Sequence, residues 1–202
     1  YWPLALELAT AWIKQRGGDI ESISGFADRL DRLNFNDVSL VPHGYPATAY
    51  RVVMDLLRDL TENENTLIIG IALMGGHHIP VPLLDSWIAT LGSTRELLNG
   101  LMRRNVVTMS LHPDQRGPHD YDEFVDMHDA VQLILTRSPE GIPIQGSALI
   151  ALVDACSDRI KDLIKEQRFI EAATLLPPID VLLSRCVSSF PPADIPGEWT
   201  TL

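Results

Sequence analysis

The chain of 202 residues is long enough for one or two domains, and its 46% hydrophobic and 21% charged residues are ordinary for a folded globular protein. With 27 acidic against 16 basic side chains, the formal net charge of −11 makes nucleic acids and anionic membranes poor partners. No apolar run reaches the ~18 residues of a membrane-spanning helix, and no signal peptide is visible. The two cysteines lack metal-type spacing and fit reduced thiols, so we expect a cytoplasmic protein without a metal site.

The first predicted elements are two amphipathic helices. Apolar residues at helical spacing predict a helix over 3–16, in which Pro3 suits the first turn, and a second helix over 19–33. A segment with several Pro and Gly residues at 37–46 predicts a domain boundary. Because the chain begins inside an amphipathic pattern and without Met, we expect a piece of a larger protein, with residues 1–38 forming the end of a helical domain.

The middle of the chain is predicted to hold four more helices. Asn63 or Asn65 can start the second of them, and a stiff connection with two prolines at 79–82 leads to the third. Ser93 can cap the fourth, with Glu96 completing a capping box. The apolar spacing places these helices at 48–60, 63–74, 82–91 and 94–102.

Two strands are predicted after these helices. Residues 106–111 are β-branched and alternating, and 123–128 alternate again after a polar loop. Several helices followed by a hairpin with a polar tip is the winged-helix order, which we predict for residues 47–138.

The C-terminal part is predicted to be helical. After a second Pro-containing linker, apolar spacing predicts a helix over 147–165 and shorter ones over 169–176 and 179–186. The turn at the start of the second resembles that of a tetratricopeptide repeat, so we predict a TPR-like segment over 145–187. Residues 188–202 contain three prolines and a glycine and are predicted to be a loose tail.

The stretch Met127-His128-Asp129 lies where a predicted strand is followed by a helix. Alternation places Met127 inward and His128 outward, and Asp129 suits a helix start. A histidine donor beside the free amides of a helix N-terminus suits an anion such as a phosphate.

Two stretches resemble motifs of the STAND nucleotide-dependent switches, the NB-ARC family. Met127-His128-Asp129 is similar to the Met-His-Asp motif that closes the family's winged-helix domain. The start of the chain resembles the family's Gly-Leu-Pro-Leu-Ala-Leu motif, although Tyr1 and Trp2 stand where the family has Gly and Leu. The order and spacing of these stretches agree with the family over residues 1–138.

The resemblance implies a mainly α fold: a helical segment, a winged-helix domain with a small β-hairpin, and TPR-like helices. It implies that the intact protein binds ADP or ATP with Mg between a missing nucleotide-binding domain and this arm. His128 would approach the β-phosphate, Pro3 would lie beside the adenine, and Asp129 would hold the helix start. A ligand sensed by the repeats would loosen the arm, permit exchange of ADP for ATP, and drive assembly in signal transduction.

The partners implied are the missing domain of the same chain and proteins or further copies bound through the helical sensor, with no nucleic acid or membrane. The intact protein would be a slow ATPase, whereas this chain has no P-loop and is expected to have neither catalysis nor a cofactor of its own. A winged-helix DNA-binding regulator and a helical protein–protein interaction scaffold are the alternatives. We interpret Gly75-Gly76-His77-His78 as a helix-ending glycine pair with two polar loop residues.

Overall fold

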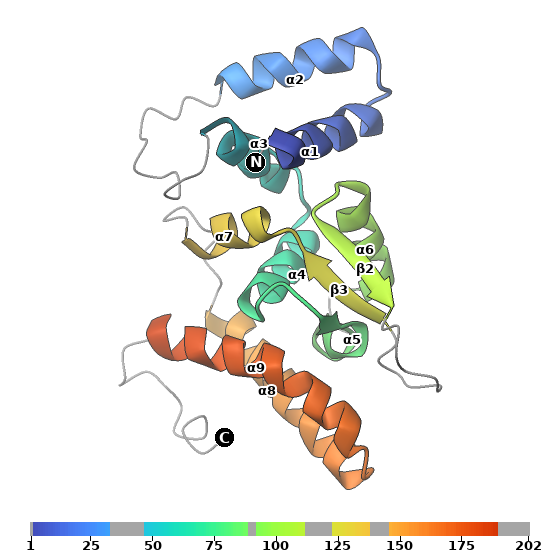
Figure 1. Ribbon diagram of the computed structural model, residues 1–202, viewed down its shortest axis with the longest axis vertical. Coiled ribbons are helices and arrows are strands. Elements are labelled where there is room, and N and C mark those ends of the chain that lie inside the picture. The colour runs from blue at the N-terminus through green and yellow to red at the C-terminus, as the bar shows by residue number, and fades with distance from the viewer. Residues whose placement is uncertain (1, 33–46, 89–91, 112–122, 138–145, 190–202) are drawn as a thin grey trace.

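The computed structural model describes residues 2–32, 47–88, 92–111, 123–137 and 146–189 (Figure 1). These ranges form a mainly helical protein with a small antiparallel sheet, which confirms the predicted fold class. The linkers at which domain boundaries were predicted, the polar loop of the hairpin and most of the predicted tail lie outside the described residues.

Three helices form the N-terminal part, at the top of Figure 1: α1 (Trp2–Gln15), α2 (Ile20–Arg32) and α3 (Ala47–Arg58). Helix α1 lies against α3 and is joined to the residue just after it, because the Trp12 indole donates to the Asp59 carboxylate at 3.1 Å. Arg16 binds the same carboxylate at 2.9 Å and stacks over the Trp12 ring. The two predicted helices before residue 33 are therefore confirmed, and α1 is fixed to the next part of the chain.

The central part contains the predicted helices and hairpin. Its elements are α4 (Glu62–Leu73), β1 (Ile79–Pro80), α5 (Val81–Ile88), α6 (Thr94–Arg103), β2 (Val107–Leu111) and β3 (Glu123–Met127). The described residues thus hold helices followed by the predicted hairpin, and the winged-helix assignment of residues 47–138 stays a prediction. Strand β1 was not predicted: we expected a stiff connection there, but Ile79 pairs with Val125 and Pro80 with Phe124. The sheet order is β1-β3-β2, so Pro80 lies in an outer strand, where a residue without an N–H is tolerated.

Helix α4 begins earlier than predicted. Thr61 is its N-cap, not Asn63 or Asn65, and Thr61 and Glu64 form a reciprocal capping box. The Thr61 hydroxyl accepts from the Glu64 amide at 3.2 Å, and the Glu64 carboxylate accepts from the Thr61 amide at 2.9 Å. This arrangement satisfies two helix-end donors at once, which a lone Asn cap cannot do.

Three helices complete the chain: α7 (Asp129–Arg137), α8 (Gly146–Lys165) and α9 (Phe169–Ser189). The last two form a hairpin at the opposite end from α1 (Figure 1). The prediction of two helices at 169–176 and 179–186 was wrong, because α9 continues through Pro177 and Pro178. A proline inside a helix costs about 3 kcal/mol, but both halves of α9 bury side chains, Leu175 before the prolines and Leu182 after them.

One buried apolar cluster runs from Trp12 in α1 to Leu182 in α9, so the terminal helices share a core with the central part. Helices α4 and α5 meet closely within it, since a Cβ on Gly70 would lie 2.2 Å from the Trp87 ring. Among the described residues, none of the helices has the length and apolar character needed to cross a membrane.

Candidate functional site

The Met-His-Asp stretch forms the junction between β3 and α7. Met127 is buried and His128 is exposed, as the predicted alternation requires. The His128 amide donates to the Val106 carbonyl at 3.5 Å, while its own carbonyl accepts from the Val131 and Gln132 amides at 2.9 and 3.1 Å. His128 thus sits at the entry to α7, beside the first-turn amides that suit an anion.

Asp129 is the first residue of α7 and not the residue that precedes the helix. The carbonyl that accepts the first helical hydrogen bonds belongs to His128, which therefore occupies the N-cap position. The Asp129 carboxylate lies 2.7 Å from His77 Nε2, in an exposed hydrogen-bonded contact. Its side chain thus joins α7 to a loop 52 residues earlier in the sequence.

That loop, Gly75-Gly76-His77-His78, does more than end α4. Gly75, Gly76 and His78 have φ angles of +103°, +76° and +52°, which fix the loop in a conformation that most side chains disfavour. The His78 amide and imidazole both bind the Asp126 carboxylate at 2.9 Å. Our interpretation of His77 and His78 as plain loop residues missed this role, because no local pattern predicts a pairing with residues so far along the chain.

Asp126 gathers three donors on the outer face of β3. Besides the two from His78, the Ser110 hydroxyl donates to its other oxygen at 2.7 Å. Burial raises the pKa of the Asp126 carboxyl, but the hydrogen bonds from the His78 amide, Ser110 and the His78 imidazole outweigh burial and hold the pKa below its usual value. Asp126 is therefore an ionised anchor at neutral pH.

Pro3 lies in the first turn of α1, and this helix approaches the junction. Asn105 Nδ2 donates to the Glu7 carbonyl, one turn after Pro3, at 3.4 Å. The next residue, Val106, accepts from the His128 amide. Helix α1, which begins with Pro3 in its first turn, is therefore linked to the Met-His-Asp stretch through Asn105 and Val106.

An open cleft lies between α1 and the end of α6, with a volume of about 570 Å³. It is lined by Glu7, Thr10, Ala11, Lys14, Gln15, Arg103 and Asn105. Lys14 and Arg103 are exposed, so the cleft has cationic side chains although the whole chain is acidic. Arg104 does not join them, because its guanidinium turns inward to the Glu64 carboxylate at 2.8 Å.

The residues present could contact a phosphate group from one side, but they do not form a complete nucleotide site. His128 and the first-turn amides of α7 can donate to an anion, and the nearby carboxylates of Asp126 and Asp129 already have histidine partners. The sequence has no glycine-rich loop with Lys-Ser or Lys-Thr to surround the phosphates. Within the described ranges, no group of three or more His, Cys, Asp or Glu side chains is arranged to hold a metal ion.

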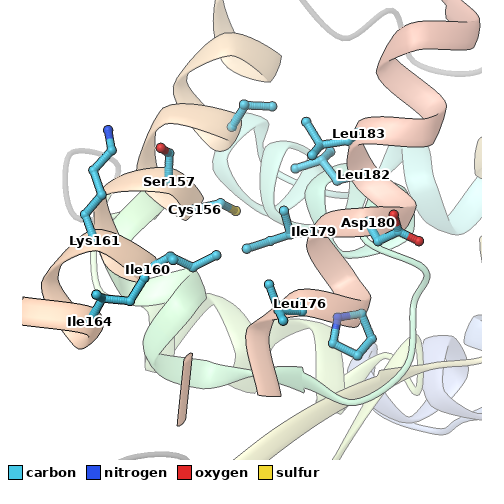
Figure 2. Close-up of a pocket in the computed structure, with 12 residues that line it drawn as sticks. Cys156, Ser157, Ile160, Lys161, Ile164, Leu176, Ile179, Asp180, Leu182 and Leu183 are labelled. Carbon is cyan, nitrogen blue, oxygen red and sulfur yellow. The ribbon is translucent and has the colours of Figure 1, made fainter. Parts of the chain in front are cut away.

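A second concave region, an apolar groove of about 630 Å³, lies between α8 and α9. Figure 2 shows Cys156 and Ile160 of α8 pointing toward Ile179 of α9 across it. Ile164 and Leu176 also line it and are half-exposed, at 50% and 55%. The sequence predicted α8 but not the single long α9 or the groove, although apolar residues on more than one side of each helix were a usable signal.

No family model, curated protein or solved structure matches this chain. The residues and their contacts therefore carry the functional argument.

Proposed function

We propose that this chain is the regulatory arm of a STAND-type switch and closes over ADP held by a nucleotide-binding domain outside this sequence. The observation that carries the proposal is the position of His128. Its neighbour Met127 is buried, whereas His128 is exposed at the entry to α7. An outward imidazole beside the first-turn amides of a helix is suited to contact a phosphate brought by another domain.

The approach of α1 to the junction supports the same proposal. In the family that the sequence resembles, the motif at the start of α1 and the Met-His-Asp motif contact one nucleotide from two sides. Here Glu7 of α1 is linked through Asn105 and Val106 to the His128 amide. A single ligand at this edge of the protein could therefore touch both stretches.

Bound ADP would supply a negative β-phosphate at the edge of the arm. The His128 ring would donate a hydrogen bond to it, and the first-turn amides of α7 would add their partial positive charge. Because the carbonyl of His128 also starts α7, a change in ring position and a change in the first turn of α7 are coupled. Loss of the contact would favour the open arm.

The decisive experiment changes His128→Leu in a longer polypeptide that includes the proposed nucleotide-binding domain. A hydrogen bond to a charged group contributes about 1.5–3 kcal/mol, so we expect roughly a 10- to 150-fold loss in ADP affinity. In the 202-residue chain alone the same change should leave the melting temperature almost unaltered, because the ring is exposed. Lys165→Leu, an equally exposed change on α8, is the matched control.

Three outcomes would oppose the proposal. Unfolding of the 202-residue chain by His128→Leu would make the histidine a structural residue. Unchanged ADP affinity in the longer polypeptide would make the motif resemblance coincidental. Calorimetry with ADP and Mg-ATP should give little or no binding to the 202-residue chain, and micromolar binding with turnover would reveal a complete site that the absence of a P-loop argues against.

The alternative of DNA binding has less support. Arg95 and Arg104, near the two ends of α6, both have carboxylate partners, Glu123 and Glu64. If α6 bound DNA, its positively charged side chains would need to contact the phosphates. A sequence-selective gel shift that survives ~0.2 M salt would favour the DNA-binding regulator over the switch arm.

A further inference from the structure

The segment from Ala72 to His78, which we name the linking segment, contacts residues on both sides of His128. Its Gly76 carbonyl accepts from the Met127 amide at 2.6 Å. Its Gly75 carbonyl accepts from the Gln132 side chain at 2.5 Å. With the two histidine–aspartate contacts already described, the segment binds residues 126, 127, 129 and 132, on both sides of His128.

The same segment is held from the other side by α9. Arg185 donates to the Ala72 carbonyl in the last turn of α4. A Cβ at Gly75 would lie 3.5 Å from a Val181 methyl group, so the Val181 side chain lies beside Gly75. Arg185 is half-buried, so this contact is partly shielded from water, and burial lowers the pKa of its guanidinium. Helix α9 therefore contacts the linking segment at Ala72 and Gly75, and the residues around the Met-His-Asp junction contact it at 75–78.

We propose that the linking segment transmits the position of α9 to the Met-His-Asp junction, with His77 and His78 as positioning residues for His128. The inference deepens the proposed function by naming how the helical hairpin regulates the site. The inference rests on the proposed function only in taking the phosphate of ADP as the group that His128 contacts. The coupling between α9 and the junction is a property of the 202-residue chain itself.

The contacts of this region differ in strength, so some of its residues can move while others stay fixed. Val125 and Met127 are buried and anchor the strand, whereas His77, His78 and Asp129 are exposed by 49%, 81% and 80% of their side chains. Exposed ion pairs contribute little stability, so they can exchange partners without unfolding the core. A glycine pair at positive φ keeps the loop in one compact path, so a displacement of Ala72 moves the histidines with it.

The test measures amide hydrogen exchange in the whole chain, at Val131 and Gln132, whose amides bind the His128 carbonyl. We expect Arg185→Ala to raise these two exchange rates roughly 2- to 30-fold, the range of energetic coupling between linked sites. In a His77→Ala, His78→Ala background, the same change should alter them less than about twofold. A His77→Gln, His78→Gln background, which keeps a donor at each position, should restore part of the effect.

Two controls separate coupling from general loosening. The Leu98 and Leu101 amides in α6 should keep their protection, and Lys161→Ala on α8 should not alter exchange at the junction. Val181→Ala replaces Arg185→Ala if the latter unfolds the chain. Equal effects in the wild-type and double-alanine backgrounds, or no effect in either, would overturn the proposal. The exchange measurement uses no nucleotide. Its result therefore does not depend on whether the His128→Leu experiment supports the proposed ADP contact.

Discussion

The two ends of helix α4 each bind a later part of the chain, but through different chemistry. At the N-terminal end, Glu64 is 6% exposed and pairs with Arg104 beyond α6. At the C-terminal end, His77 and His78 pair with Asp129 and Asp126, and of these four side chains only Asp126, at 21%, is mostly buried. A buried ion pair is costly to break because it leaves a charge out of water, whereas exposed pairs are screened and weak.

This difference assigns a separate role to each end of α4. The Glu64–Arg104 end fixes α4 against α6, because a Cβ on Gly100 of α6 would already lie 2.3 Å from the Glu64 carboxylate. The linking-segment end can rearrange without exposing apolar surface. A helix with one rigid and one adjustable end is suited to pass on a movement, and four substitutions test that contrast.

The largest effect is expected for Arg104→Ala at the rigid end. The change leaves the Glu64 carboxylate buried without its cationic partner, which costs about 3–5 kcal/mol. For a chain of this length the melting temperature should fall by roughly 6–20 °C. Arg103→Ala, the exposed neighbouring arginine, is the matched control and should change it by about 2 °C or less. Equal effects of both changes would remove the contrast between the ends.

Asp126→Asn should have the next largest effect, at the adjustable end. It removes the charge that accepts from His78 and Ser110, and we expect a loss of about 1–3 kcal/mol at pH 7 by urea denaturation. Because the folded state lowers the pKa of Asp126, its stabilisation is complete above the unfolded pKa and is lost as pH falls through the folded pKa. The two proteins should therefore converge below about pH 4.

Thr61→Ala removes the side-chain half of the capping box at the rigid end. A lost N-cap costs about 1 kcal/mol, and Thr61→Ser should restore the stability because serine keeps the hydroxyl acceptor. Thermal unfolding of the two variants checks this. A Thr61→Ser variant as unstable as Thr61→Ala would show that the threonine methyl, and not the cap, is important.

The smallest effect on stability is expected for His77→Ala. An exposed pair contributes about 0–1 kcal/mol, and the difference from wild type should shrink further in ~1 M salt. Differential scanning calorimetry at two salt concentrations provides the measurement. A loss above about 2 kcal/mol would place this pair with the rigid end and remove the physical basis for an adjustable one.

Sequence periodicity predicted the helices, the hairpin and the inward and outward sides of Met127 and His128, because these depend on local spacing. The predictions were wrong where a local sequence pattern is compatible with two structures. Thr61 with Glu64 forms the same capping pattern as Ser93 with Glu96, yet the nearby asparagines also suit helix starts. Pro177 predicted a helix end that packing on both sides overrides.

Only part of the candidate site could be predicted from the sequence. His128 and Asp129 could be placed from the change of period between a strand and a helix. Their partner His77 could not, because its contact with Asp129 spans 52 residues and exists only after β3 and α4 have packed together. Exposed polar pairings of this kind leave no periodic trace in the sequence, since neither partner contributes to the apolar pattern.

The contacts of α1 have a consequence for the order in which the chain assembles during synthesis. Within these 202 residues, α1 is made before its partners, and its polar contacts include residues 43, 47 and 98 positions further along. Long-range contacts require loop closure and form slowly. The helix therefore remains without its partner Asn105 until the residue 98 positions beyond Glu7 has been made. Through that interval, the apolar side that later buries Trp12 is open to chaperones and to other nascent chains.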